Sequence, residues 1–142
     1  MLRLSLLSIF VLASFGLAEA ADEKGPTEPT YLYRAKVLTV LDGDTVDMDI
    51  DLGFYVQMKA QRIRLLGIDA PEPRGETQAA GEAATAYLRD LIEGKTVIVR
   101  TVHGEDDPDR TDSFGRWFGQ IYLEGTDISQ EMIRSGHAKS DP

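Results

Sequence analysis

The chain has 142 residues, a net charge of −9 and no cysteine. This length indicates one domain, and apolar and charged fractions of 42% and 27% are ordinary for a globular protein. The acidic charge argues against a general electrostatic binder of nucleic acid, because long-range repulsion opposes the approach of phosphate. The absence of cysteine excludes a disulfide framework.

Residues 1–20 have the three parts of a secretory signal peptide. Arg3 is a short basic start, an apolar stretch follows from Leu4 to Leu17, and small residues surround Ala20. The apolar stretch is shorter than the roughly 20 residues that span a bilayer. We therefore predict a cleaved signal and an exported protein, secreted or periplasmic, with no membrane attachment after cleavage; a retained anchor or a buried helix is the alternative. Residues 21–33 are polar, contain two prolines and read as a flexible lead-in.

The first half of the domain, which we place at residues 34–142, is predicted to be strands. Residues 34–41 lead to the turn pair Asp42-Gly43. Residues 45–51 alternate apolar and acidic side chains, which is typical of a strand with one dry and one wet face. After a turn at Leu52-Gly53, the third strand, 54–66, changes its apolar parity near Gln61. Such a change predicts a bulge or bend.

The second half alternates helices and strands. We predict a helix over 77–93 that stops at Gly94, strands over 96–102 and 117–123, and a short helix over 126–135 capped by Asp127. A polar loop occupies 103–113. Three strands, a helix, two strands and a helix indicate a mainly β fold with helices (α+β). Their order is that of a five-stranded Greek-key OB barrel with two helices packed on it, although several α+β folds share it.

Acidic residues and arginines concentrate around the third predicted strand. Arg62 and Arg64 share one face of that strand, and Asp69 and Glu72 lie just past its end, where Pro71 restricts the backbone. Asp44 begins the second strand, which neighbours the third in a small barrel. We therefore expect Asp44 to approach Asp69.

These residue types suit hydrolysis of a phosphodiester. Two carboxylates bind a hard divalent cation, a third carboxylate orients or deprotonates water, and arginines clamp the phosphate and stabilise its developing charge. Each residue alone has an ordinary structural explanation, as a hairpin turn or a surface strand residue. The occurrence of all of them, in this order, favours catalysis.

Three segments resemble the signature segments of staphylococcal (micrococcal) nuclease domains. They are residues 40–46 (VLDGDTV), 62–72 (RIRLLGIDAPE) and 112–116 (DSFGR). The resemblance implies an OB barrel that cuts single-stranded DNA and RNA in a calcium-dependent reaction, with little sequence preference and 3′-phosphate products. It implies roles for six residues: calcium ligands Asp44, Asp69 and the Ala70 carbonyl, water-orienting Glu72, phosphate-binding Arg64, and Arg116 at the leaving-group side.

The chain also departs from that pattern. Ala70 and Phe114 stand where the staphylococcal enzyme has threonine and tyrosine, and the tyrosines and third helix that follow in that enzyme have no counterpart before Pro142. We expect a complete catalytic set, a reduced substrate-binding surface and a monomer. A catalytically inactive domain that binds nucleic acid or protein is the main alternative. A generic OB barrel for an oligosaccharide or protein is another, but it leaves the acids and arginines unexplained.

Overall fold

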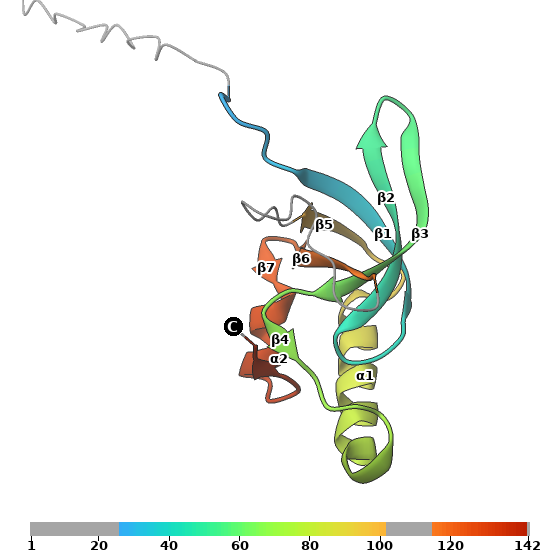
Figure 1. The fold of residues 1–142 in the computed structure, drawn as a ribbon, viewed down its shortest axis with the longest axis vertical. Coiled ribbons are helices and arrows are strands. Elements are labelled where there is room, and N and C mark those ends of the chain that lie inside the picture. The colour runs from blue at the N-terminus through green and yellow to red at the C-terminus, as the bar shows by residue number, and fades with distance from the viewer. Residues whose placement is uncertain (1–25, 102–114, 142) are drawn as a thin grey trace, which may run out of the picture.

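Five strands form a closed barrel in the computed structural model, which describes residues 26–101 and 115–141. Figure 1 shows the arrangement. The main elements are β1 (Leu32–Val40), β2 (Thr45–Gly53), β3 (Val56–Leu65), α1 (Gln78–Ile92), β5 (Thr96–Thr101), β6 (Trp117–Leu123) and α2 (Ile128–Arg134). The minor elements are β4 (Ile68–Asp69), the 3₁₀ turn η1 (Gly75–Thr77), β7 (Thr126–Asp127) and β8 (Lys139–Ser140).

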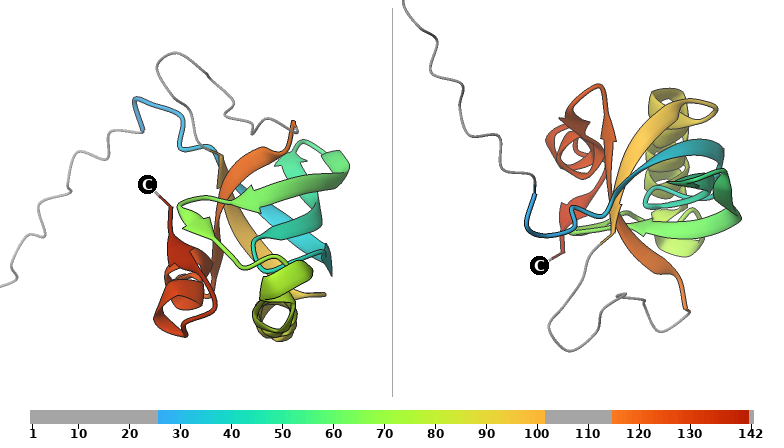
Figure 2. Two further views of the ribbon diagram at one scale, coloured as in Figure 1. Left: turned by 60° about the horizontal axis from the view of Figure 1, so that its bottom comes forward. Right: turned by 90° about the horizontal axis from the view of Figure 1, so that it is seen from above.

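The barrel closes where β3 meets β6. Strands β3, β2, β1, β5 and β6 pair antiparallel in that order, and β6 then pairs parallel with β3, with Ile63 opposite Trp117 and Leu65 opposite Gly119. The two views in Figure 2 show the strands wrapping around one interior. This closure and the helices confirm the predicted OB-type fold. The short β4–β8 and β6–β7 pairings were not predicted.

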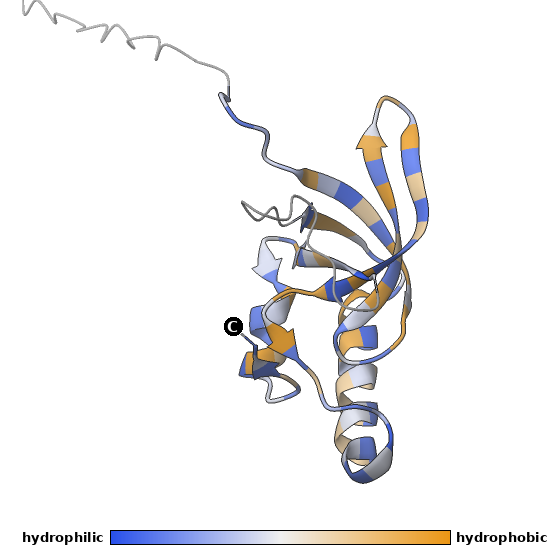
Figure 3. Ribbon diagram, in the orientation of Figure 1, coloured by the Kyte–Doolittle hydropathy of each residue, from blue (hydrophilic) through white to orange (hydrophobic). Residues whose placement is uncertain are grey.

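Apolar and acidic side chains of β2 lie on opposite faces of the strand, as predicted. Val46, Met48 and Ile50 are buried in the core, whereas Asp47, Asp49 and Asp51 are only partly buried on the outer face. Figure 3 shows this alternation as a change of colour along the strands. The outer face of β2 is therefore a line of three carboxylates.

The predicted irregularity of the third strand is present next to Gln61. The register of β2 against β3 shifts between Met48 and Ile50, and Ala60 has a φ of 49°. The Asp49 carboxylate accepts a hydrogen bond of 2.9 Å from the Ala60 backbone N–H. The acid thus satisfies a donor that the bulge would otherwise leave without a strand partner.

Beyond the bulge, the structure differs from the sequence expectation. Phe54 and Tyr55, which were placed at the start of the third strand, form the turn of the β2–β3 hairpin and are almost fully exposed. Val56 is also exposed. The hairpin extends past the barrel (Figure 1), so its apolar tip has no core to face. The turn lies after Gly53, and not at Leu52-Gly53 as predicted.

Both helices lie at the end of the barrel opposite the hairpin tip (Figure 1). Helix α1 buries Ala84, Leu88 and Ile92. The predicted cap of the second helix is confirmed, since the Asp127 side chain accepts from the Gln130 backbone N–H at 3.2 Å. No helix in the described ranges is long and apolar enough to cross a membrane. The predicted signal peptide lies outside the described residues.

Candidate active site

Asp44 is held in place by the turn that begins β2. Its backbone N–H donates to Asp42 Oδ1 at 3.1 Å, and its carbonyl accepts from the Leu65 N–H at 2.8 Å. A Cβ added to Gly43 would lie 2.6 Å from the Cβ of Ala70 and 2.8 Å from that of Ala84. The absence of a side chain at position 43 therefore lets α1 and the chain after β3 close around Asp44.

The Asp44 carboxylate is 4% exposed and has three donors. The Thr45 hydroxyl donates to Oδ1 at 2.9 Å, the Ala70 backbone N–H donates to Oδ2 at 3.1 Å, and Arg64 Nη1 donates to Oδ1 at 3.1 Å. Burial raises the pKa of the Asp44 carboxyl above its ordinary value, against the lowering by Ala70 and by the charge of Arg64. Burial is therefore the larger effect on this pKa, and the positive charge of Arg64 offsets only part of it.

Arg64 connects the two predicted metal-ligand carboxylates. It lies opposite Thr45 in the β2–β3 register. Its Nη2 donates to Asp69 Oδ1 at 3.2 Å while its Nη1 contacts Asp44. One planar guanidinium therefore brings an oxygen of each acid to within hydrogen-bond distance of itself. The expected approach of Asp44 and Asp69 is present.

Asp69 is positioned by the short β4–β8 pair. It lies opposite Lys139, and Ile68 beside it is buried. The Asp69 side chain is 65% exposed, in contrast to that of Asp44. Of the two predicted metal-ligand carboxylates, Asp44 is therefore fixed inside the protein and Asp69 is open to solvent.

Glu72 follows on a loop that α1 holds. Its carbonyl accepts from the Thr77 hydroxyl at 2.9 Å, and a Cβ on Gly81 would lie 2.3 Å from the Glu72 carbonyl carbon. The side chain is 60% exposed and forms an ion pair of 3.2 Å with Arg74. The carboxylate is thus accessible on a loop whose backbone is fixed by close contact with a helix.

Arg116 reaches the same cluster from the start of β6. Its Nη1 donates to the Thr45 hydroxyl at 3.1 Å, and Thr45 in turn donates to Asp44. Thr45 therefore links Arg116 to the acid–arginine cluster, a role that the sequence pattern does not indicate. Residues 112–114 of the third signature segment lie outside the described residues.

A groove of about 740 Å³ borders the cluster. Glu72, Arg74 and Arg116 line it near the cluster, and Asp47 and Arg62 line it along the outer face of β2 and β3. The groove places exposed donors and acceptors beside the buried carboxylate. Three arginines, Arg62, Arg74 and Arg116, line it together with three acids, Asp42, Asp47 and Glu72, so its formal charges balance although the chain as a whole has a net charge of −9.

The donor set fits a hard divalent cation. Asp44 and Asp69 each have an oxygen within hydrogen-bond distance of the Arg64 guanidinium, and the Ala70 N–H, rather than its carbonyl, contacts Asp44. Oxygen donors of this kind are those that calcium takes in proteins. No group of three or more His, Cys, Asp or Glu side chains suited to a metal occurs within residues 26–101 and 115–141. A site here would therefore need backbone or substrate oxygens as well.

The fold and this cluster together define an OB barrel with an acid–arginine site beside its closure. The chain belongs to the family of staphylococcal nuclease homologues, whose model matches residues 62–141. That match includes five of the six predicted site residues; Asp44 precedes it.

Curated relatives agree with this assignment. An uncharacterized endonuclease of Escherichia coli is 39% identical over 72% of this chain and 58% of its own length. A thermonuclease of Staphylococcus hyicus is 27% identical over 94% of this chain and 72% of its own length. Protein ParB of Escherichia coli is 36% identical over 63% of this chain and 42% of its own. The chain thus spans a little over half of the endonuclease relative.

Proposed function

We propose that the chain is a calcium-dependent phosphodiesterase that hydrolyses single-stranded DNA and RNA with little sequence preference and leaves 3′-phosphate ends. The observation that carries this proposal is the bridging of Asp44 and Asp69 by Arg64, with Arg116 joined to the same cluster through Thr45. Membership of the nuclease family and the names of the relatives support it.

The proposal gives each residue a task. Asp44, Asp69 and the Ala70 carbonyl would hold calcium, which supplies positive charge to polarise a phosphoryl oxygen. Arg64, with two donors already aimed at anionic oxygens, binds the phosphate in place of a carboxylate. Glu72, exposed at the groove, takes a proton from the attacking water.

Arg116 acts on the leaving oxygen during hydrolysis. The water oxygen forms a bond to phosphorus and the bond from phosphorus to the 5′ oxygen breaks, which leaves a 3′-phosphate and a 5′-hydroxyl. A guanidinium near the 5′ oxygen stabilises the charge that develops there. The 5′ oxygen acquires its proton from solvent.

We also propose that the protein is exported and acts as a monomer. The signal-like pattern of residues 1–20 supports export. Calcium is usually plentiful outside cells, where such an enzyme would work.

An inactive binding module is the second candidate. The net charge of −9 and the pairing of Arg64 with both carboxylates favour it, because a paired arginine must leave its partners before it binds phosphate. The phosphodiesterase would cleave nucleic acid, whereas the binding module would bind it without cleavage.

Cleavage of labelled single-stranded DNA and RNA, with calcium and then with a chelator, tests the proposal. We expect calcium-dependent cleavage, and products that a polymerase extends only after phosphatase treatment. Asp44→Asn should lower the rate by about 10² to 10³, whereas Asp90→Asn, an exposed acid on α1, should not. Cleavage unaffected by the chelator, or by Asp44→Asn, would contradict the proposed mechanism.

A further inference from the structure

The outer face of β2 and β3 carries a second arginine next to the site. Arg62 lies opposite Asp47, one step along the face from Arg64 opposite Thr45. Its Nε donates to Asp47 Oδ1 at 2.9 Å and its Nη2 to Oδ2 at 3.0 Å, which is a bidentate pair. Arg62 is therefore held in one orientation beside the groove.

The geometry of this pair leaves donors available to a ligand. A guanidinium has five N–H groups, and Asp47 accepts two of those of Arg62. The Arg62 side chain is 53% exposed, and Arg74, which is more exposed, lines the same groove. Asp47 raises the pKa of Arg62 through the side-chain hydrogen bond and its charge, so the guanidinium stays cationic.

The spacing of the two arginines matches a polynucleotide. Arg62 and Arg64 are two residues apart on one strand, which separates them by about 6.7 Å along β3. This is comparable to the separation of successive phosphates in an extended single strand. A chain bound with one phosphate at Arg64 thus has its next phosphate near Arg62.

We propose that Arg62, oriented by Asp47 and assisted by Arg74, forms a second phosphate subsite that binds the phosphodiester adjacent to the one being cleaved. This inference rests on the proposed function. It makes the preferred substrate a polynucleotide rather than an isolated phosphodiester. It also explains how an acidic protein retains a nucleic acid, through a short row of oriented arginines.

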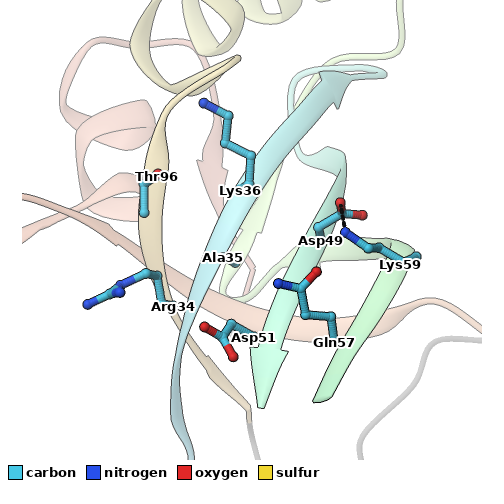
Figure 4. Close-up of a pocket in the computed structure, with 8 residues that line it drawn as sticks. All are labelled: Arg34, Ala35, Lys36, Asp49, Asp51, Gln57, Lys59 and Thr96. Atoms are coloured by element: carbon cyan, nitrogen blue, oxygen red, sulfur yellow. Dashed lines mark hydrogen bonds and ion pairs between the residues drawn. The ribbon is translucent and has the colours of Figure 1, made fainter. Parts of the chain in front are cut away.

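A neighbouring hollow on the same face supplies a matched control. Figure 4 shows this smaller hollow, of about 200 Å³, which is lined by residues of β1, β2 and β3 and by Thr96 of β5. There Lys59 pairs with Asp49 at 2.8 Å, as Arg62 pairs with Asp47, but farther from the site. Lys59 does not line the groove beside Glu72 and Arg116. Lys59→Gln therefore removes a cross-strand ion pair without removing a donor from the groove.

The test compares two substrates of different length. One is a nitrophenyl ester of thymidine 5′-phosphate, which has a single phosphodiester, and the other is an eight-nucleotide single strand. We expect Arg62→Gln to lower kcat/KM on the oligonucleotide about 10-fold, mainly through KM, and to leave the ester unchanged. Lys59→Gln should change neither. Equal effects of the two variants on the oligonucleotide would overturn the subsite.

Two further arms separate binding from structure. A neutral methylphosphonate next to the scissile position should lower wild-type kcat/KM and have no further effect in Arg62→Gln, as in a double-mutant cycle. Asp47→Asn retains the guanidinium but removes the carboxylate that orients it, so kcat/KM on the oligonucleotide should fall, but less than in Arg62→Gln. If Asp47→Asn and Arg62→Gln reduce cleavage equally, Arg62 acts only through the ion pair.

The failure of the proposed function remains distinguishable from that of the subsite. Absence of hydrolysis of both substrates contradicts the proposed function alone. The subsite is then tested by binding alone. Fluorescence anisotropy measures the affinity for the oligonucleotide at several salt concentrations, with Glu72→Gln present in every variant. Arg62→Gln should reduce the slope of log affinity against log salt by about 0.7, the value for one phosphate contact on a single strand. An unchanged slope would overturn the subsite.

Discussion

The two ends of the β2–β3 ribbon differ in burial and in hydrogen bonding. At one end, Thr45 and Arg64 are opposite one another and join a hydrogen-bonded cluster around a buried acid. At the other end, Phe54 and Tyr55 are 98% and 105% exposed and have φ values of 50° and 63°. The same two strands therefore lead to a buried, hydrogen-bonded cluster at one end and to an exposed turn at the other.

The difference arises from what surrounds each end. The site end is covered by β6, α1 and the β4–β8 pair, each of which supplies a contact to the acids or arginines. The far end is a two-stranded hairpin, which is only marginally stable by itself. Precise placement of charged groups thus depends on closure of the barrel around them, and not on the strands alone.

Arg116→Lys, like Asp44→Asn, should have a large effect at the site end. Lysine retains the charge but not the planar fork, so we expect kcat on the oligonucleotide to fall by about 10² while the thermal midpoint stays near that of the wild type. Steady-state kinetics and thermal melting measure the two. Wild-type turnover would remove Arg116 from the reaction.

Gly81→Ala tests whether α1 positions Glu72. Its Cβ would lie 2.3 to 2.4 Å from the backbone of Glu72 and Pro73, so one of the two segments must move. We expect a loss of about 1–3 kcal/mol in the free energy of unfolding and a fall in kcat of about 10-fold. Ala83→Gly, an exposed change on the same helix, costs about 1 kcal/mol and serves as the control. If both variants keep full kcat, the contact has no catalytic role.

Thr45→Val removes the hydroxyl that joins Asp44 to Arg116 and keeps the side-chain shape. We expect kcat to fall about 10-fold, because the two groups lose their common partner. Thr45→Ser restores the hydroxyl and should recover most of the rate. A valine variant as active as the serine variant would show that the link is dispensable.

The far end should respond in stability alone. Asn-Gly at positions 54 and 55 suits the positive φ values of this turn better than two aromatic residues do. Phe54→Asn combined with Tyr55→Gly should therefore raise the free energy of unfolding by about 1 kcal/mol, measured by urea denaturation, with cleavage unchanged. A loss of cleavage would show that the hairpin tip contributes to the active site.

Asp49→Asn should have the smallest effect. The hydrogen bond from Lys59 lowers the pKa of the Asp49 carboxyl in the folded state. Its stabilising contribution is therefore present above the unfolded pKa, about 3.9, and is lost as pH falls through the folded value. We expect the stability of Asp49→Asn to decline less between pH 5 and pH 2, in acid denaturation followed by circular dichroism. A decline as steep as that of the wild type would contradict the ion pair.

The sequence predicted those features that depend on local pattern. Alternation in β2 identified its two faces, the parity change near Gln61 indicated the bulge, and Asp127 was recognised as a cap. The joint occurrence of acids and arginines identified Asp44, Arg64, Asp69 and Arg116, which the structure brings into one cluster. These signals need only neighbouring residues or a known order of segments.

Features that depend on distant segments were not predictable from pattern. Nothing in the run from Phe54 to Val56 shows that the ribbon extends past the barrel, so its apolar residues were assigned to a strand. The role of Thr45 depends on Arg116, which is 71 residues away. The close approach of Gly81 to Glu72 likewise depends on how α1 packs.

The parallel pairing of β3 with β6 has a consequence for the timing of activity. It joins segments that are more than 50 residues apart, and contacts of high sequence separation form late and slowly in folding. Until this seam closes, Arg116 is not brought to Thr45 and Asp44, so an unfolded or half-folded chain has no complete site. Under the proposed function, a newly made chain would therefore not cut the nucleic acid of its own cell for as long as it remains unfolded.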